Sequence, residues 1–369
     1  MNRVLVTGGA GFIGSFVVEE LLRRGADVRV LDSLEPQVHE DGEAPDYLHP
    51  DAELVTADIL DRGALAAALR GVDSVVHLAA AVGVGQSMYQ LRRYVDINSG
   101  GTAALLEAIA GSSVQRIVVA SSMNVYGEGE YVDARGRAVD AAPRGRAQLA
   151  ERQWEMESAA GELLTPRPTA EDKKPEPASP YALTKYDQEL LCLMFGTAYG
   201  IPTVALRLFN VYGPRQALSN PYTGVMAIFA CRLLNDEPPV IFEDGRQLRD
   251  FVSVYDVARA FCAALERPHV SGCAINIGSG RAVSIREVAH TLTQKLGRPI
   301  PPRIEGKYRV GDVRHCFADI SRAAALLDYR PQVEFEEGVE ELVEWLSLQT
   351  AIDRAPLAGE ELARRGLTL

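Results

Sequence analysis

Residues 3–14 read RVLVTGGAGFIG, a short apolar run that leads directly into a turn with a glycine at every third position from residue 8. The run Arg3–Val6 is typical of a buried strand, and the residues after the turn show the apolar spacing of a helix. A glycine-rich turn between a strand and a helix lets the backbone approach a pyrophosphate, whose charge is attracted by the free N–H groups of the helix. The stretch therefore predicts a dinucleotide-binding unit.

A carboxylate stands at the end of the next predicted strand. The apolar stretch Val28–Leu31 is followed by Asp32, eighteen residues after Gly14. A carboxylate in this place can accept hydrogen bonds from both ribose hydroxyls of an adenosine, and it would repel a 2′-phosphate. The sequence therefore favours NAD over NADP as the cofactor.

The composition argues against several classes of protein. The net charge of −12 disfavours binding to nucleic acid or to an anionic membrane. No apolar run reaches the ~18 residues that a membrane helix needs, and the first predicted strand begins too early for a signal peptide to precede it. The cysteines form no C-x-x-C pair, so we expect reduced thiols in a cytoplasmic protein and no metal site: Cys192, Cys231, Cys262, Cys273 and Cys316.

Strands and helices alternate over residues 1–210, which predicts an α/β fold with a doubly wound parallel sheet that helices cover on both faces. Residues 128–180 interrupt this alternation and are rich in Pro, Arg, Glu and Ala, so we expect an insertion or lid that is partly mobile. Over residues 211–350 the alternation of strands and helices is less regular. Residues 351–369 are expected to be a loosely attached tail.

Ligands of open parallel sheets bind outside the carboxyl ends of the strands. The small residues Ala79–Ala81 follow a predicted strand and would let a dinucleotide lie across its end. Asp58 follows another predicted strand, at residues 53–56. Two interpretations of this residue remain open: its carboxylate meets the adenine amino group of the cofactor, or it caps the helix expected at 62–69. A long helix expected at 94–110 carries Asn98.

A tyrosine and a lysine lie four residues apart in a helix expected at 180–199, so Tyr181 and Lys185 project from one face. A free tyrosine titrates near pH ~10. A nearby ammonium and a positive nicotinamide ring favour the phenolate, which can take a proton from a sugar hydroxyl. Ser122, at the end of a predicted strand, would share that hydroxyl by a hydrogen bond. The three side chains together predict oxidation of an alcohol with hydride transfer to NAD.

These motifs resemble the extended short-chain dehydrogenases/reductases of the nucleotide-sugar epimerase/dehydratase group. The resemblance implies that residues 1–210 form a Rossmann domain with bound NAD, in which Ser122, Tyr181 and Lys185 are catalytic. It further implies that residues 211–350 form a smaller α/β substrate domain, interleaved with the first, that binds a dTDP- or UDP-linked sugar. It also implies a homodimer formed through the helices at 94–110 and 180–199, although their apolar faces could equally pack only on the sheet. The resemblance extends to about residue 349 and rests on Thr7–Gly14, Asp58, Leu78–Ala80, Ser121–Gly127, Tyr181–Lys185, Leu206–Arg215, Arg249–Val252 and Arg309–Asp319.

The motifs and the resemblance together indicate the binding residues. The cofactor would contact Gly8, Gly11, Phe12, Ile13, Asp32, Asp58, Ile59, Leu78, Ala79, Ala80, Asn98, Tyr181 and Lys185. The nucleotide sugar would contact Met123, Asn124, Asn210, Phe242, Arg249, Arg309 and Asp312. Of the arginines at motif positions, at least one is expected to be structural: Arg207, Arg215, Arg249, Arg309 and Arg314.

The residues after the catalytic serine indicate the type of reaction. Dehydratases of the group carry Asp-Glu there, whereas this chain has Met123 and Asn124, which cannot exchange a proton as a carboxyl group does. The sequence therefore favours a 4-epimerase, which oxidises C4, lets the 4-keto sugar rotate and reduces it on the other face. A 4-ketoreductase, a dehydratase and a non-catalytic NAD-binding module are the alternatives.

The identity of the sugar rests on weaker observations. The apolar thioether of Met123 suits a C6 methyl group, or it packs under the nicotinamide. Residues 203–224 and 241–252 are similar to enzymes that act on dTDP-6-deoxyhexoses such as dTDP-L-rhamnose. UDP-hexoses and UDP-uronates remain the alternative substrates.

Overall fold

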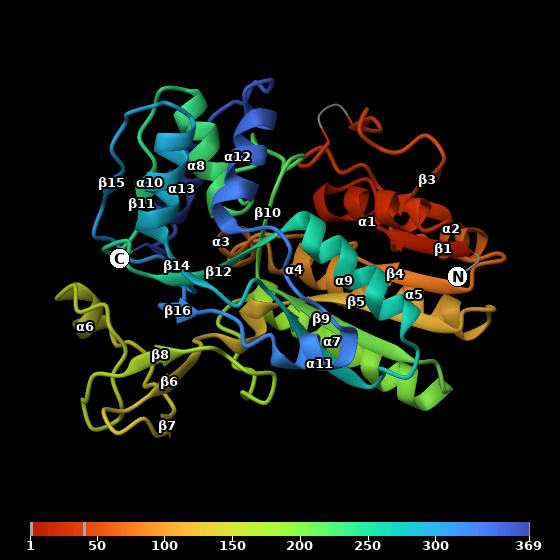
Figure 1. Ribbon diagram of the computed structural model, residues 1–369, viewed down its shortest axis with the longest axis horizontal. Helices are drawn as coiled ribbons and strands as arrows, with labels where there is room; N and C mark the ends of the chain where they lie inside the picture. Colours follow the sequence, from red (N-terminus) through yellow and green to blue (C-terminus); the bar gives the residue numbers. More distant parts are fainter. Residues whose placement is uncertain (1–2, 40–41, 369) are drawn as a thin grey trace.

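The computed structural model describes residues 3–39 and 42–368, and its centre is a seven-stranded sheet (Figure 1). All neighbouring strands of this sheet are parallel, and the order runs outward from β1 in both directions. The predicted α/β class with a doubly wound parallel sheet is confirmed. In spatial order the strands are β13 (Cys273–Ile277), β9 (Thr203–Leu208), β5 (Arg116–Ser122), β4 (Ser74–His77), β1 (Arg3–Thr7), β2 (Asp27–Asp32) and β3 (Glu53–Thr56).

Helices cover both faces of the sheet because alternate strand residues are apolar on each side. In β1, Val4 and Val6 belong to one buried cluster, whereas Leu5 belongs to the other. Among the described residues, no helix combines the length and the apolar character needed to cross a membrane. The first face carries α1 (Phe12–Arg23), α9 (Val254–Glu266) and α11 (Ser321–Leu327), and the second carries α2 (Arg62–Ala68), α5 (Gly101–Ala110) and α7 (Pro180–Tyr199).

The helix expected at 94–110 is not a regular α-helix along its whole length. It consists of α4 (Leu91–Tyr94), a π-helical segment η2 (Val95–Gly100) and α5, all with helical backbone angles at the junctions. Such π-turns are uncommon and often occur near functional sites. Here the segment carries the buried Asn98.

A second, smaller α/β unit packs beside the carboxyl ends of the sheet strands. Its core joins three helices and a short mixed sheet into one buried cluster. The chain returns from this region to supply β13 of the large sheet, so the two units are interleaved. The elements are β10 (Asn210–Tyr212), α8 (Val225–Leu234), β11 (Val240–Ile241), β12 (Leu248–Ser253), β14 (Ala282–Ser284), α10 (Ile285–Lys295), β15 (Arg303–Ile304), β16 (His315–Cys316) and α12 (Phe335–Leu346).

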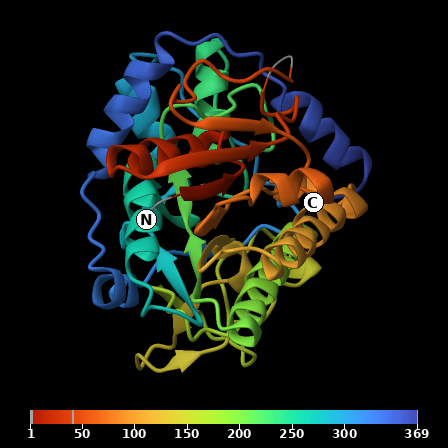
Figure 2. The same cartoon turned by 90° about the vertical axis from the view of Figure 1, so that its right-hand side faces the viewer.

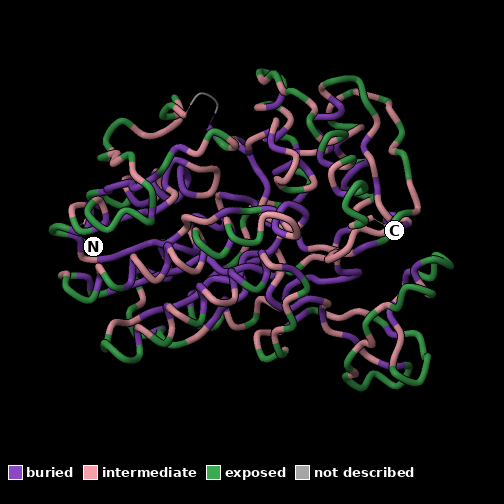
Figure 3. The backbone as a smooth tube through the Cα atoms, turned by 180° about the vertical axis from the view of Figure 1, so that it is seen from behind, coloured by how far each residue is buried: buried purple, intermediate pink, exposed green. Residues whose placement is uncertain are grey.

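The expected insertion at 128–180 is a folded lobe that protrudes from the body (Figures 1 and 3). It contains a three-stranded antiparallel sheet with a small apolar cluster of Tyr131, Met156 and Leu164. No residue between 128 and 178 lines the large groove described below, so the interpretation as a lid over that groove is corrected. The elements of the lobe are β6 (Glu130–Val132), β7 (Ala138–Val139), α6 (Arg146–Ala150) and β8 (Thr165–Arg167).

The C-terminal residues are not the loosely attached tail that the sequence suggested. They contain α13 (Ala355–Arg364), whose Ala358 and Leu362 are buried. The backbone after the helix pairs with the segment around Arg309 in an isolated antiparallel bridge. The segment contains apolar residues at helical spacing. They were not sufficient to predict a helix, because the segment is short and most of its residues are polar.

Candidate functional site

A groove with a volume of about 1410 Å³ runs along the carboxyl ends of the sheet strands, between the sheet and the second α/β unit. This volume exceeds the roughly 300–1,000 Å³ of a pocket for one small ligand. The groove can therefore hold two ligands that meet end to end. Its position agrees with the rule that open parallel sheets bind ligands at the carboxyl ends of their strands.

The glycine turn forms one end of the groove. Gly8 has a φ of +72°, and a Cβ at this residue would lie 2.8 Å from the backbone nitrogen of Ala79. At Gly14 a Cβ would lie 2.1 Å from the carbonyl oxygen of Gly8. Helix α1 begins directly after its N-cap Gly11, which has no side chain that could accept hydrogen bonds. N–H groups in the first turn of the helix are therefore available to donate hydrogen bonds to a ligand. The turn thus has the shape and the donors that a pyrophosphate requires.

Asp32 is held at the end of β2 by two backbone donors. Its Oδ2 accepts a hydrogen bond from the Ala10 nitrogen at 3.0 Å, and its Oδ1 accepts one from the Leu34 nitrogen at 3.0 Å. The side chain lines the groove near the glycine turn. A carboxylate fixed in this place suits the two hydroxyls of a ribose.

The two interpretations of Asp58 are separated by the geometry of α2. The N-cap of this helix is Asp61, whose Oδ1 accepts hydrogen bonds from the nitrogens of Gly63 and Ala64 at 2.8 and 3.0 Å. Capping by Asp58 is therefore wrong. Asp58 instead lines the groove next to Ile59, where it can meet a ligand.

Asn98 is the exception among the predicted cofactor residues, because it is fully buried and does not line the groove. Its Oδ1 accepts from the Ala81 nitrogen at 2.7 Å, and its Nδ2 donates to the Ala81 oxygen and to Thr184 Oγ1. The expected direct contact is corrected to an indirect role: Asn98 fixes the segment after β4 against α7. The others all line the groove: Gly8, Gly11, Phe12, Ile13, Asp32, Asp58, Ile59, Leu78, Ala79, Ala80, Tyr181 and Lys185.

Ser122, Tyr181 and Lys185 all line the groove, and the side chains of Ser122 and Tyr181 are hydrogen-bonded to each other. Ser122 ends β5, while Tyr181 and Lys185 occupy successive turns of α7, which begins at the N-cap Ser179 and Pro180. Lys185 Nζ donates a hydrogen bond to Gln188 Oε1 at 2.7 Å. The predicted serine, tyrosine and lysine are thus brought to one place by two different elements.

Burial dominates the titration of these groups. It raises the pKa of Tyr181, and the Ser122 hydroxyl only partly opposes this shift. Burial also lowers the pKa of Lys185 to about 8. The lowered tyrosine pKa expected from the sequence is therefore absent in the protein alone, and the phenolate needs additional positive charge in the groove.

The other half of the groove is lined by the predicted substrate residues. Arg309 forms an ion pair with Asp312 at 2.8 Å, which raises its pKa, and its guanidinium lies 5.6 Å from the ring centre of Phe242. Arg249 donates to the carbonyl oxygens of Leu248, Val313 and Arg314. The predicted residues on this side are Met123, Asn124, Asn210, Phe242, Arg249, Arg309 and Asp312.

Three amide oxygens point to a polar ligand in this half. Within residues 3–39 and 42–368, Asn210 Oδ1, Gln216 Oε1 and Gln247 Oε1 are buried without a hydrogen-bond partner, and all three residues line the groove. Buried polar atoms in folded proteins almost always have partners. A ligand with hydroxyl or N–H groups would satisfy them.

Three of the five motif arginines are structural. Arg207 is buried in an ion pair with Glu189, and Arg215 pairs with Glu19 over the ring of Phe16. The guanidinium of Arg314 is fully buried among three carboxylates. Arg249 and Arg309 remain as the two that line the groove.

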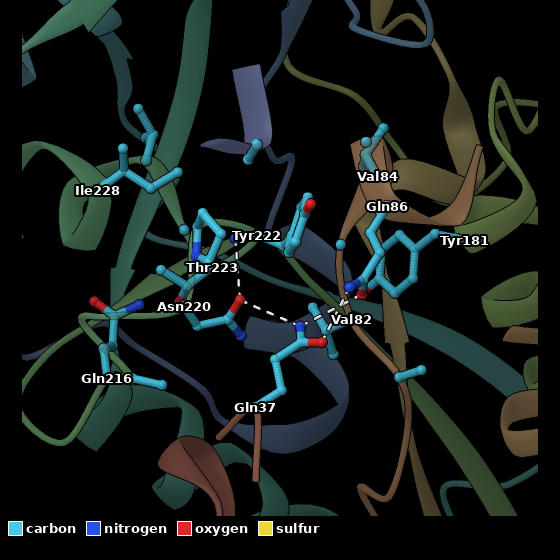
Figure 4. Close-up of a pocket in the computed structure, with 18 of the residues that line it drawn as sticks. Gln37, Val82, Val84, Gln86, Tyr181, Gln216, Asn220, Tyr222, Thr223 and Ile228 are labelled. Atoms are coloured by element: carbon cyan, nitrogen blue, oxygen red, sulfur yellow. Dashed lines mark hydrogen bonds between the residues drawn. The ribbon is translucent and has the colours of Figure 1, made fainter. Parts of the chain in front are cut away.

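Sequence reasoning missed a cluster of amide side chains that crosses the groove (Figure 4). Gln37 Nε2 donates to Asn220 Oδ1 at 3.2 Å, and Gln86 Nε2 donates to Gln37 Oε1 at 3.0 Å. Tyr94 also donates to Gln86. The cluster joins a loop of the sheet domain to the second unit. No sequence motif predicts the cluster, because its three amide residues are far apart in the sequence.

The chain was compared with known proteins. The model of the NAD dependent epimerase/dehydratase family matches residues 4–146 and 157–278. A dTDP-L-rhamnose 4-epimerase of Burkholderia thailandensis is 41% identical over 352 residues, 94% of this chain and 95% of the relative. A UDP-glucose 4-epimerase of Thermotoga maritima, solved with UDP-glucose, has a TM-score of 0.77 and 32% identity, and the match covers 94% and 99% of the two chains. A UDP-glucuronic acid 4-epimerase of Bacillus cereus, solved with its substrate and NAD, has a TM-score of 0.77 and 30% identity over the same shares.

Proposed function

The chain belongs to the NAD dependent epimerase/dehydratase family, and from this premise we propose that it is an NAD-dependent nucleotide-sugar 4-epimerase. The observation that carries the proposal is that Ser122, Tyr181 and Lys185 line one groove together with the glycine turn and with Arg249 and Arg309. Related proteins with this activity are at least 30% identical over nearly their whole length.

The side chains of the groove divide the reaction between them. When bound, NAD supplies reversible hydride transfer at C4 of the sugar. Tyr181 takes the proton of the C4 hydroxyl during oxidation and returns it during reduction, while Ser122 holds the same oxygen. Lys185 is a cation that lines the same groove one helical turn after Tyr181. Asn124 Nδ2 donates to Ser122 Oγ at 3.1 Å and so orients the serine hydroxyl.

The absence of carboxylates next to Ser122 favours epimerisation over dehydration. Elimination of water from the sugar requires an acid and a base near C5 and C6. Met123 and Asn124 line the groove at this place, and neither can exchange protons. A 4-keto sugar in this site therefore has one productive fate, which is reduction on either face after rotation.

The side chain of Met123 supports a 6-deoxyhexose as the sugar. It is buried beside Phe209 and Val313, so the wall that it forms is apolar. Such a wall suits a C6 methyl group and disfavours a carboxylate, which would lose its hydration without a partner. The relationship to a dTDP-L-rhamnose 4-epimerase supports the same choice. We therefore propose a dTDP-6-deoxyhexose such as dTDP-L-rhamnose as the substrate.

Proton NMR of the purified protein with a panel of nucleotide sugars tests the substrate. The panel contains dTDP-L-rhamnose, dTDP-glucose, UDP-glucose, UDP-glucuronate and GDP-mannose, without added cofactor. We expect a C4 epimer of unchanged mass from dTDP-L-rhamnose alone. Turnover of UDP-glucuronate would contradict the role of Met123, and turnover only with added NADH would indicate a ketoreductase.

We further propose that the protein acts as a cytoplasmic homodimer. Exposed apolar side chains lie along α7 and the neighbouring helices, and pairing with a second copy would bury them. All five cysteines are free, which suits a reducing compartment.

A further inference from the structure

The C-terminal residues 351–368, here called the C-terminal strap, bridge the two sides of the groove. In Figure 2 the dark blue α13 runs along the edge of the molecule towards the orange segment that contains α3 (Val84–Ser87) and α4. Residues of the strap line the groove together with the sheet domain and the second unit. A loosely attached tail would not make such contacts, whereas a wall of a binding site would.

One end of the strap docks on α3 and the residues that follow it. Leu362 is 5% exposed, and its Cδ1 would lie 3.3 Å from a Cβ built on Gly85. Val84, the neighbour of Gly85, packs against the cluster that contains Tyr181. The guanidinium of Arg365 lies 4.5 Å from the ring centre of Tyr89. The strap thus contacts the segment that adjoins the cluster of Tyr181.

The other contacts hold the strap to the segment that binds the nucleotide. The Val310 nitrogen donates to the Leu367 oxygen at 3.0 Å, next to the pairing of Arg309 with Thr368. At the start of the strap, Asp353 forms an ion pair at 2.7 Å with the buried Arg232 of α8. The bridge at Thr368 thus joins the strap to Arg309, which is proposed to bind the nucleotide sugar.

The face of α13 that lines the groove leaves space for a ligand. Ala358 and Gly359 both line the groove, and no described atom lies within 4 Å of a Cβ built on Gly359. A ligand in the groove can therefore approach the helix backbone here. A bulky residue at this position would fill ligand space without touching the protein.

We propose that the C-terminal strap forms a wall of the nucleotide-sugar site and keeps the oxidised sugar in the groove until it is reduced again. The inference rests on the proposed epimerase function. In each cycle C4 gives up a hydride and the hydroxyl gives up a proton. A 4-keto sugar that escapes leaves both electrons on the cofactor and the proton in the solvent, so each escape ends the activity of one enzyme molecule.

The test compares two leucines of α13 in the full-length protein. Leu362→Asp breaks the docking on Gly85, whereas Leu357→Asp changes a side chain that is 65% exposed and does not line the groove. We expect Leu362→Asp to raise KM for the nucleotide sugar by about ten-fold or more. We also expect it to release 4-keto sugar, trapped from the medium with a carbonyl reagent, and to leave an equal amount of reduced cofactor on the enzyme. Leu357→Asp should behave as the wild type.

Gly359→Leu provides a second test that does not depend on undocking. Leucine favours a helix over glycine by roughly 1 kcal/mol, so α13 stays folded. We expect a raised KM without released 4-keto sugar, because the groove is narrowed while the strap remains in place. If Leu362→Asp does not fold, Leu362→Ala replaces it.

The proposal is overturned if either Leu362→Asp or Gly359→Leu has the KM of the wild type. It is also overturned if Leu357→Asp raises KM as much as Leu362→Asp does. Failure of the proposed function has a different signature: the wild type epimerises no nucleotide sugar. In that case equilibrium dialysis with dTDP still tests the strap as a wall, since Gly359→Leu should weaken binding and Leu357→Asp should not.

Discussion

Tyr181 shows how a single residue depends on its surroundings for its chemistry. It is buried at the start of α7, and burial alone raises its pKa. A tyrosine in this state is a hydrogen-bond donor, and it becomes a base when positive charge is brought near it. Lys185 is a cation on the next turn of the same helix, and its ammonium donates a hydrogen bond to Gln188.

Replacement of this hydroxyl tests the assignment. We expect Tyr181→Phe to lower kcat by about 10²–10⁴-fold, the usual contribution of general acid–base catalysis. The protein should still be purified with its cofactor, because the glycine turn and Asp32 are unchanged. Tyr199→Phe, at the exposed end of the same helix, is the matched control and should keep full activity. Normal turnover by Tyr181→Phe would remove this residue from the mechanism.

His77 gives the stability of the protein a dependence on pH. Its two ring nitrogens contact Thr7 Oγ1 and Thr102 Oγ1 at 2.8 and 2.9 Å, and burial, with help from Lys185, lowers its pKa to about 3. The unfolded chain binds a proton below about pH 6.5, whereas the folded protein does not. The contribution of His77 is therefore fully present above that pH and is lost as the pH falls, by up to about 1.4 kcal/mol per unit.

Urea unfolding between about pH 7 and about pH 5 measures this slope, in a range above most carboxyl titrations. We expect His77→Gln to flatten it. His290→Gln changes an exposed histidine of α10 and should leave the slope as in the wild type. Equal slopes for the two variants would show that another group causes the loss of stability.

Sequence reasoning at this scale succeeded where a residue belongs to a local motif. The glycine turn, Asp32 and the Tyr181–Lys185 pair each follow from spacing along the chain, and they lie in the groove. Sequence reasoning failed where the role of a residue depends on contacts that the sequence does not show. Whether Asp58 or Asp61 caps α2 depends on one turn of backbone, and Asn98 turns inward because Ala81 and Thr184 offer it partners.

At the scale of elements, the insertion is held to the second unit by buried charges. Arg314 pairs with Glu155 of the insertion and with Glu243 and Asp244, and both Arg314 and Glu243 are almost completely buried. Glu243 also pairs with Arg144 of the insertion. The ion pairs thus fix the lobe beside the strand that leads to Phe242.

Removal of this arginine leaves buried carboxylates without a partner. We expect Arg314→Gln to lower the free energy of unfolding by about 3–5 kcal/mol. The matched control Arg62→Gln breaks the ion pair with Glu107 on the surface, where such a pair contributes about 0–1 kcal/mol. Urea unfolding of both variants gives the comparison. Equal losses would mean that the Arg314 cluster is replaced by water or by neighbouring side chains.

The elements themselves were predictable to different degrees. The periodicity of residues 3–32 and the capping by Ser179 define their strands and helices locally. The short strands of the insertion and helix α13 were not recognised, because they are stabilised by contacts with distant segments. Tyr131, Met156 and Leu164 come together only when the lobe has folded.

At the scale of the whole molecule, the surface retains an apolar stripe that the fold does not cover. Leu183, Leu190 and Met194 are exposed along α7, and Leu91 and Val95 are exposed on the adjacent α4 and η2. Monomeric proteins rarely expose large contiguous apolar patches. The stripe is the surface expected at an interface with a second copy.

Sedimentation at micromolar concentration tests this expectation. The wild type should sediment as a dimer of two 40.0-kDa chains. Met194→Arg should shift the protein towards the monomer, because a charge in an apolar interface loses its hydration. Leu348→Arg, at an 83% exposed position away from the stripe, should remain a dimer. A monomeric wild type would contradict the homodimer.

The overall architecture follows from the alternation of strands and helices, whereas the closure of the groove does not. The parallel sheet, with its helices on both faces, is encoded in local apolar patterns. The walls of the groove come from residues such as Gln37, Asn220 and Leu362, which meet only in the folded chain. Patterns along the sequence do not predict contacts between residues that are so far apart in the chain.

A dTDP-L-rhamnose that carries deuterium at C4 tests whether the protein removes and returns the same hydride. The purified protein, without added cofactor, is incubated with this sugar, and the product is analysed by NMR and mass spectrometry. A 4-epimerase that removes and returns the same hydride predicts a product with inverted C4 that retains the deuterium. Loss of the deuterium to the solvent, or a product formed only in proportion to added reduced cofactor, would contradict the account.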